Sequence, residues 1–346
     1  MSKETRVQHF VLDGSDPMTL LSHMAFYGLA SIIETEGFTG LRLSWTEGMA
    51  PRPRLCGPGL TEQDLAERVR RHAATRAGAL SWPSERVLVA GKARGLMSPR
   101  MGKVDDWDDL QHQRHAVLGR LTKEGAWLDL QLLWSLGEPC YWRLNRKGER
   151  MQDDGTSRLE MQPRNQGSEI VANRFAPLAG FVGTRSLEAV IAGLRGEVTN
   201  DELGHGQADS RSATGFRGPG PVDDALSWCA LWGISQFPLT PSIRRAATTA
   251  GHLGPSSGGW FYVPTWRGDW SASRLRTILV AKQLRAFATE ATGEPTAEPT
   301  LGVAAKWLAA RGVRAVVTFP VERFGSPSAP ERRAQRGTLH RLGVAS

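Results

Sequence analysis

Clusters of lysine and arginine are the residues of this sequence whose type and spacing best suit a chemical role. The densest cluster occupies thirteen residues that contain no acid, and its members are Lys92, Arg94, Arg100 and Lys103. Glycine and proline punctuate this stretch, as in loops whose N–H groups and cations contact phosphate groups. The spacing therefore predicts a phosphate-binding loop over residues 91–103.

A second basic cluster comes directly after Tyr141 and Trp142. Its candidate nucleic-acid contacts are Arg143, Arg146 and Lys147. Glu149 and two nearby aspartates dilute its charge, so this cluster is weaker than the first.

Residues 242–286 form a third basic region, with seven basic residues and one acid. Its candidate contacts are Arg244, Arg245, Arg274, Lys282 and Arg285. On one continuous helix, the last three would project within about 80° of arc. Three such regions, with acids gathered at residues 105–109, favour a nucleic-acid-binding surface over an ordinary solvated face.

Two glycine motifs do not meet the requirements of a catalytic loop. An ATP-binding loop needs four residues between its glycines and Ser or Thr after its lysine, whereas six residues separate Gly95 from Gly102 and Val104 follows the lysine. The G-x-S-x-G run at 254–258 has its strand after it, whereas a nucleophile elbow needs a strand before and a helix after. Both are interpreted as ordinary loops.

Histidines offer another route to chemistry. His112 and His115 could share a helix face, but a zinc site needs two more ligands and no Cys pair supplies them. His205 lies between two glycines and histidine is a common general base, yet no partner residue is identifiable for it in that role. We therefore expect no metal, no cofactor and no catalytic residue.

The composition is that of a globular protein with excess positive charge. The net charge is +8 and the isoelectric point is about 9.8, which suggests a polyanionic partner. The three cysteines lie far apart, as in proteins of a reducing compartment. No apolar run approaches the ~20 residues of a membrane span, and the first residues lack the apolar segment of a secretory signal. We expect a cytoplasmic protein without a membrane partner.

The periodicity of apolar residues predicts an α+β fold. We expect a mixed sheet with helices in residues 1–220 and a mainly helical part in residues 221–330, followed by a basic, disordered tail at 331–346. The stretch 197–221 is rich in Gly, Asp and Ser, so it predicts a mobile loop or a domain boundary.

Individual elements are expected to position the basic clusters. The alternating apolar residues of 127–134 predict a strand, and Arg86 to Ala90 predicts a strand that leads into the basic loop. Three prolines at 51–58 predict a loop. One long helix, capped by Ser273, is expected to end at about Thr292.

Two nine-residue segments resemble each other. Residues 21–29 and 226–234 share Leu, Ser, Ala and Gly at matched positions. In each segment the Ala and the Gly are three residues apart, on one helix face, which permits close backbone approach. Each segment follows an aspartate-containing turn and precedes a tryptophan-bearing strand. The pattern predicts two equivalent helices that pack tightly in related halves.

Several of these features together resemble a family of CRISPR proteins. They are the turn at Asp16 and Pro17, the segment 21–33 with Ala25 and Gly28, the helix at 223–237, the segment 128–134 with the basic stretch after it, and Gln166, Gly167 and Ser168. Over most of its length the chain is similar to the small large-subunit proteins of type I CRISPR systems, subtype I-G (formerly I-U). It departs from that pattern at 197–221 and in its Arg-rich end.

The resemblance implies a subunit of an RNA-guided surveillance complex (Cascade). In such complexes guide RNA reads the target by base pairing, while protein reads a short flanking motif on duplex DNA. The implied partners are double-stranded target DNA, the guide RNA complex, other Cascade subunits and a separate helicase-nuclease. Arg164, Asn165 and Gln166 are candidates for a groove-reading loop, because amide side chains offer donors and acceptors to base edges.

We therefore expect a non-catalytic nucleic-acid-binding subunit of such a complex. Two alternatives stay open. One is a metal-independent CRISPR RNA-processing endonuclease that uses His205 or His23. The other is a structural adaptor whose basic surface binds an acidic protein.

Overall fold

The computed structural model describes residues 7–89, 91–99, 104, 106–137, 143–144, 147–148, 150–151, 156–161, 169–207, 214–240, 247–255, 258–294, 301–325 and 331–342. The helices are α1 (Leu20–Thr35), α2 (Glu62–Ala74), α3 (Trp107–Lys123), α4 (Trp127–Gly137), the π-helix η2 (Val171–Phe175), α5 (Ala176–Thr184), α6 (Leu187–Arg195), α7 (Asp224–Trp232), the 3-10 helix η3 (Gly233–Gln236), α8 (Ala272–Leu279), α9 (Lys282–Ala291) and α10 (Leu301–Ala309). The strands are β1 (Val7–Val11), β2 (Arg42–Trp45), β3 (Pro53–Pro58), β4 (Arg86–Val89), β5 (Lys92–Gly95), β6 (Arg143–Leu144), β7 (Arg150–Met151), β8 (Leu239–Thr240), β9 (Thr248–Thr249), β10 (His252–Leu253), β11 (Trp260–Trp266), β12 (Val313–Phe324), β13 (Glu331–Ala334) and β14 (Thr338–Arg341). The predicted α+β class is confirmed.

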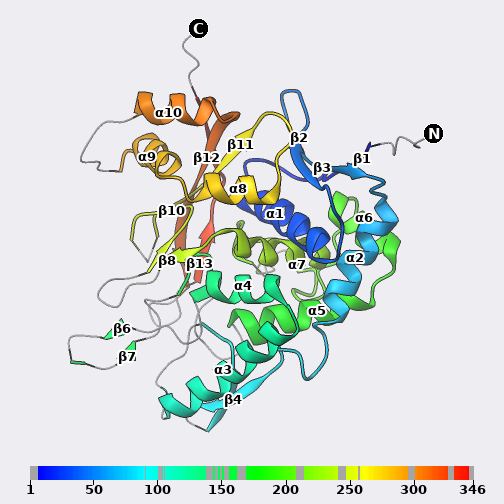
Figure 1. Cartoon of the computed structure of the whole chain (residues 1–346), viewed down its shortest axis with the longest axis vertical. Coiled ribbons are helices and arrows are strands. Elements are labelled where there is room, and N and C mark those ends of the chain that lie inside the picture. Colours follow the sequence, from blue (N-terminus) through cyan, green and yellow to red (C-terminus); the bar gives the residue numbers. More distant parts are fainter. Residues whose placement is uncertain are drawn as a thin grey trace.

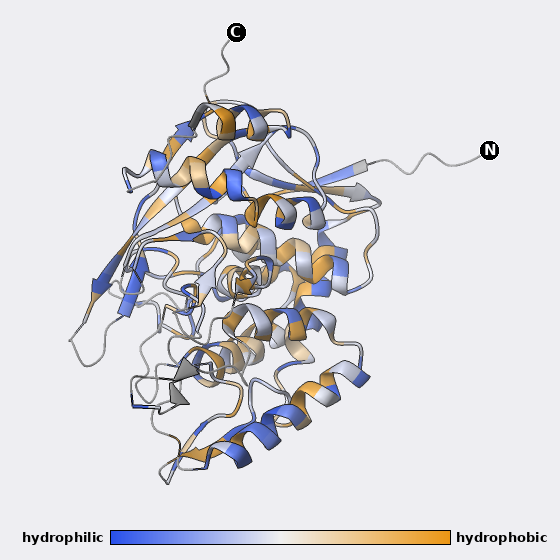
Figure 2. Ribbon diagram, turned by 60° about the vertical axis from the view of Figure 1, so that its left-hand side comes forward, coloured by the Kyte–Doolittle hydropathy of each residue, from blue (hydrophilic) through white to orange (hydrophobic). Residues whose placement is uncertain are grey.

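Two helices, α1 and α7, lie at the centre of the molecule (Figure 1). Every residue of α1 from Leu20 to Ile33 is buried, and all of α7 except Leu226 is buried. A helix that is apolar on all sides must be enclosed by other elements. Figure 2 accordingly shows hydrophobic residues concentrated in the central helices.

α1 and α7 cross at two glycines. A Cβ atom on Gly28 would lie 1.8 Å from the carbonyl oxygen of Cys229, and one on Gly233 would lie 2.2 Å from that of Met24. These pairings mean that the helices run in opposite directions at the crossing, with each glycine against the other backbone. The close packing predicted from the repeated segments is confirmed, because any side chain here would force the helices apart.

The tryptophan-bearing strands that follow these helices also meet. β2 belongs to an antiparallel sheet of order β1-β3-β2, and β11 to one of order β10-β11-β12-β13, in which β14 also pairs with β12. Trp266 on β11 donates its indole N–H to the carbonyl oxygen of Leu43 on β2 (3.1 Å), and its ring lies 5.7 Å from that of Trp45. The strand that follows α1 and the strand that follows α7 thus contact each other through their tryptophans.

The segment 127–134 forms helix α4, so the predicted strand is wrong. Its leucines alternate with polar residues at 129 and 131, which mimics a strand. Asp129 is nevertheless buried, because it accepts hydrogen bonds from Trp82 Nε1 (2.7 Å) and Arg76 Nε (2.8 Å). A helix enclosed on most sides need not show the 3.6-residue period of apolar residues. The alternation of leucines with polar residues therefore indicated a strand wrongly.

Two further segments form strands where loops were expected. Residues 53–58 form β3, the central strand of its sheet, with Pro53 and Pro58 at its two ends, where proline is tolerated. The Arg-rich end at 331–341 forms β13 and β14, so the expected disorder is wrong for these residues. The reason is that the twelve-residue β12 offers backbone groups along its whole length, and β13 and β14 pair with different parts of it.

The helix expected from Ser273 to Thr292 is two helices, α8 and α9, with a break at Val280 and Ala281. Ser271, rather than Ser273, caps the first. Leu275 and Leu284 are both buried, yet on one continuous helix they would point about 180° apart. The break lets both face the core.

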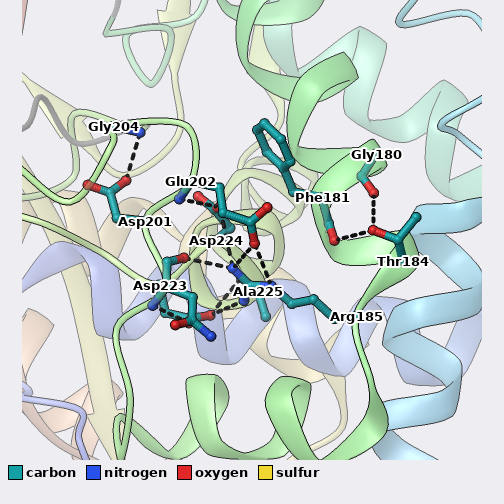
Figure 3. Close-up of polar contacts among 11 residues, drawn as sticks. Gly180, Phe181, Thr184, Arg185, Asp201, Glu202, Gly204, Asp223, Asp224 and Ala225 are labelled. Carbon is teal, nitrogen blue, oxygen red and sulfur yellow. Dashed lines mark hydrogen bonds and ion pairs between the residues drawn. The ribbon is translucent and has the colours of Figure 1, made fainter.

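A buried ion-pair network holds residues 200–202 of the stretch 197–221 (Figure 3). Arg185 contacts Asp223 (2.9 Å), Asp224 (3.4 Å) and Glu202 (3.1 Å). Asp224 in turn accepts a hydrogen bond from the backbone N–H of Glu202 (2.9 Å), and burial raises the pKa of Asp224 to about 7. These contacts tie residues 200–202 to the rest of the fold, and the mobility expected of the stretch stays a prediction. One hydrophobic cluster joins α1, α7 and β12, and the division near residue 220 stays a prediction.

Candidate nucleic-acid interface

The first basic cluster begins in an antiparallel hairpin, β4–β5, and the predicted loop is a strand as far as Gly95. Val87 and Val89 are buried, whereas Leu88 between them is 75% exposed. Val89 pairs with Lys92 and Val87 with Arg94, so both cations lie on the same face of the hairpin as the two valines, and Leu88 lies on the opposite face. Alternation of buried and exposed residues along β4 decides this arrangement.

Contacts from two other segments hold the hairpin in place. The fully buried Arg114 of α3 donates from Nε to the carbonyl oxygen of Leu96 (2.9 Å) and from Nη2 to that of Ser98 (2.8 Å). A Cβ atom on Gly95 would lie 2.7 Å from Oε1 of Glu169, so only glycine allows this approach. Glu169 is itself fixed, because its carboxylate accepts backbone hydrogen bonds at the start of η2.

Lys92 and Arg94 are available for binding. Lys92 is exposed and Arg94 half-exposed. In the part of the chain that the structure describes, neither side chain has a hydrogen-bond or ion-pair partner. Arg86, on the opposite strand, differs, since it donates to the carbonyl oxygens of Ser84 (2.6 Å) and Ala172 (3.3 Å).

The cations of α8 and α9 are mostly engaged within the protein. Arg274 donates to the carbonyl oxygen of Arg311 (2.7 Å) and lies 4.9 Å from the ring centre of Trp270. Arg285 donates to the carbonyl oxygen of His252 (3.4 Å). Lys282 is exposed, but it is on α9 while Arg274 is on α8, so the single face predicted for these three cations is wrong.

The remaining predicted contacts are only partly described. Arg100, Lys103, Arg146, Arg164, Asn165, Gln166, Arg244 and Arg245 lie outside the described residues. The backbone of Arg143 is in β6, but its side chain is outside them as well. Lys147 lies in the turn between β6 and β7 and is exposed.

The structure does not bring the hairpin and the α8–α9 cations together. The hairpin lies at one end of the long axis of the molecule, and α8 and α9 lie toward the other end (Figure 1). Of the two, only the hairpin presents neighbouring cations without internal partners. It is therefore the better candidate interface.

The two histidines of the nuclease alternative have unequal surroundings. His23 is fully enclosed, with Nε2 at 2.8 Å from the carbonyl oxygen of Pro17 and Nδ1 at 3.3 Å from the hydroxyl of Tyr27. Burial lowers the pKa of His23 to about 4, so it is neutral and out of reach of a bound strand. His205 is exposed and has a positive φ of 58°, which is uncommon outside glycine.

Leu88 is the feature of the hairpin that the charge pattern missed. Nothing in a count of cations selects it, although its place between two buried valines on a strand predicts that it points away from the core. An exposed leucine on the face opposite the free cations gives the hairpin an apolar contact as well as charge.

In the described part of the chain, no helix combines the length and the apolar character needed to cross a membrane. Comparison with protein-family models and with the sequences of curated proteins finds no match to this chain.

Proposed function

We propose that this protein is a non-catalytic nucleic-acid-binding subunit that contacts duplex DNA through the β4–β5 hairpin. The observation that carries the proposal is a two-stranded ribbon whose neighbouring cations, Lys92 and Arg94, have no partner among the described residues. The major groove of B-DNA admits a two-stranded β-ribbon. A hairpin that carries free cations therefore fits between two phosphate backbones.

The parts of the hairpin would act differently on DNA. Lys92 and Arg94 would pair with phosphates and release counterions, which supplies affinity without sequence preference. Leu88 would make apolar contact with a thymine methyl or with a base step. The anchoring by Arg114 supports this role, because a ribbon held rigidly spends less free energy on ordering when it binds.

The proposal extends to a larger assembly on the strength of the family resemblance. An RNA-guided surveillance complex needs a subunit that contacts duplex DNA beside the target, while guide RNA supplies most of the sequence reading. We place this chain in that role, with the guide RNA complex, other Cascade subunits and a helicase-nuclease as its partners in the cytoplasm.

The test is the salt dependence of duplex binding by a variant with Lys92→Ala and Arg94→Ala. Each lost phosphate contact lowers the slope of log affinity against log salt by about 0.9. We expect a slope smaller by about 1.8 and weaker binding at low salt. An unchanged slope would remove the hairpin from the interface. Leu80→Ala, an exposed side chain outside the hairpin, is the matched control and should change nothing.

The alternatives are separated by two further measurements. Cleavage of a labelled repeat RNA in the presence of a chelator would favour the nuclease, and it should then depend on His205. Retention of an acidic protein together with loss of DNA binding would favour the adaptor.

A further inference from the structure

Helix α4 is buried except for one stripe. Trp127 is 62% exposed and Trp134 is 48% exposed, with the half-exposed Gln131 between them. Every other residue of the helix is buried. Positions i, i+4 and i+7 lie on one helix face, so the solvent-facing side of α4 is a row of tryptophan, glutamine and tryptophan.

These two tryptophans differ from the others in the described chain. Six are buried, namely Trp45, Trp82, Trp228, Trp232, Trp266 and Trp270. Three are half-buried, namely Trp107, Trp260 and Trp307. Packing of the fold thus accounts for the rest but leaves Trp127 and Trp134 with open ring surface. Exposed aromatic residues on a rigid element often form binding sites for another molecule.

The face itself is uncharged, and cations lie at both of its ends. The only charged residue of α4, Asp129, is buried and bound to Arg76 and Trp82. Arg120 and Lys123 are exposed in the last turn of α3, next to the start of α4. Glu124 is the exposed acid among them, 3.9 Å from Arg120.

At the other end, Arg276 lies beside the last turns of α4. Its guanidinium donates to the carbonyl oxygen of Ser235, which also accepts from the hydroxyl of Ser135, the neighbour of Trp134. Arg120 and Arg276 are engaged within the protein, so Lys123 is the cation beside this face that has no partner among the described residues. Exposed aromatic rings beside such a cation suit a strand with stackable bases and a charged backbone.

We propose that Trp127 and Trp134 stack on the unpaired bases of a single nucleic-acid strand. Seven residues along a helix advance about 10.5 Å. Two bases between two rings need three stacking intervals of about 3.4 Å, or about 10 Å, so the spacing suits two bases. A duplex does not offer these base faces, because its bases already stack on each other. The inference rests on the proposed nucleic-acid function and adds its substrate form, an opened strand.

Continuity with the hairpin supports a nucleic-acid strand rather than a protein on this face. Arg120, next to α4, pairs with Glu85 at the base of β4. The start of the tryptophan row and the base of the hairpin therefore lie at the same end of α3. A strand released from a duplex held at the hairpin would meet the tryptophans next.

The experiment compares binding of a labelled oligothymidine of about 15 nucleotides, within the range that one binding fold covers, with binding of a duplex of equal length. Trp127→Ala with Trp134→Ala should weaken strand binding about 25-fold or more, since each stacked base contributes at least about 5-fold. The salt slope should not change, because no phosphate contact is lost. Duplex binding should stay as in the unchanged protein.

Controls separate the two proposals. Trp127→Phe with Trp134→Phe retains the rings and should recover most of the strand affinity, which a variant that merely misfolds would not explain. Unchanged strand affinity in the alanine variant would overturn the stacking site. If the same variant also gained or lost binding of a protein partner, the face would be assigned to that partner. Loss of duplex binding in the hairpin variant with strand binding intact would leave both proposals standing. The unchanged protein could fail to bind duplex while its strand binding still depends on the tryptophans. That result would overturn the hairpin proposal and leave the stacking site supported.

Discussion

The β4–β5 hairpin and the α8–α9 region have similar basic sequences but use their cations differently. On the hairpin, Lys92 and Arg94 have no partner among the described residues, while buried contacts hold the backbone. On α8 and α9, Arg274 and Arg285 each donate to a backbone carbonyl oxygen of a distant segment. A cation that stabilises the fold is not free to bind phosphate. Density of charge in a sequence therefore does not by itself locate an interface.

The largest expected effect concerns the anchor of the hairpin. Arg114→Met would leave the carbonyl oxygens of Leu96 and Ser98 without their buried donor. Buried unpaired groups are costly, so we expect the free energy of unfolding to fall by about 3 kcal/mol, measured by urea denaturation. Arg120→Met, on the exposed side of the same helix, should cost less than about 1 kcal/mol. Equal losses would show that the hairpin does not depend on this anchor.

A smaller effect is expected at α8 and α9. Arg274→Ala with Arg285→Ala removes two hydrogen bonds and a cation–π contact, so the free energy of unfolding should fall by about 2 kcal/mol. The salt slope of duplex binding should not change, in contrast to the hairpin variant. A slope reduced as much as in that variant would erase the distinction between the two regions.

The smallest effect is a pH dependence to which His252 contributes; it lies on β10 and contacts Arg285 of α9. Burial, with Arg158, Arg332 and Arg285 nearby, lowers the pKa of His252 to about 3. The folded protein keeps this ring neutral, whereas the unfolded chain binds a proton below about pH 6.5, so stability present above pH 6.5 is lost as the pH falls. Between pH 6.5 and 5.5 this histidine should account for about 1 kcal/mol.

The variant His252→Gln tests this assignment. Glutamine retains a donor for the carbonyl oxygen of Gly258, which His252 contacts at 2.9 Å, but it does not titrate. Unfolding measured at several pH values should show a weaker acid dependence in the variant. The same dependence in both proteins would assign the acid response to other groups, among which His23 acts in the same direction.

Parts of the fold could be predicted because their signals are local. Thr61 is a residue type favoured at helix N-caps; it caps α2, and its hydroxyl accepts the N–H of Asp64 at 3.0 Å. The strand at Arg86 was expected from alternation, which the backbone obeys directly. Matched glycines at 28 and 233 predicted a close helix crossing, since only a missing side chain permits such an approach.

Other parts depended on long-range partners and could not be predicted. Asp129 made 127–134 look amphipathic, and only the distant Arg76 and Trp82 allow it to be buried in a helix. The break between α8 and α9 carries no glycine or proline to mark it, although the opposed directions of Leu275 and Leu284 were a signal.

By itself the sequence determined the α+β class, the excess of positive charge and the tight packing of two glycine-bearing helices, because composition and periodicity act locally along the chain. Tertiary structure decided which cations are free and which tryptophans face solvent. Arg94 and Arg274 are the same residue type in similarly basic stretches, and only the second finds a carbonyl oxygen from a distant segment within reach. Whether a side chain is used internally depends on what the fold brings next to it, and that information is not local.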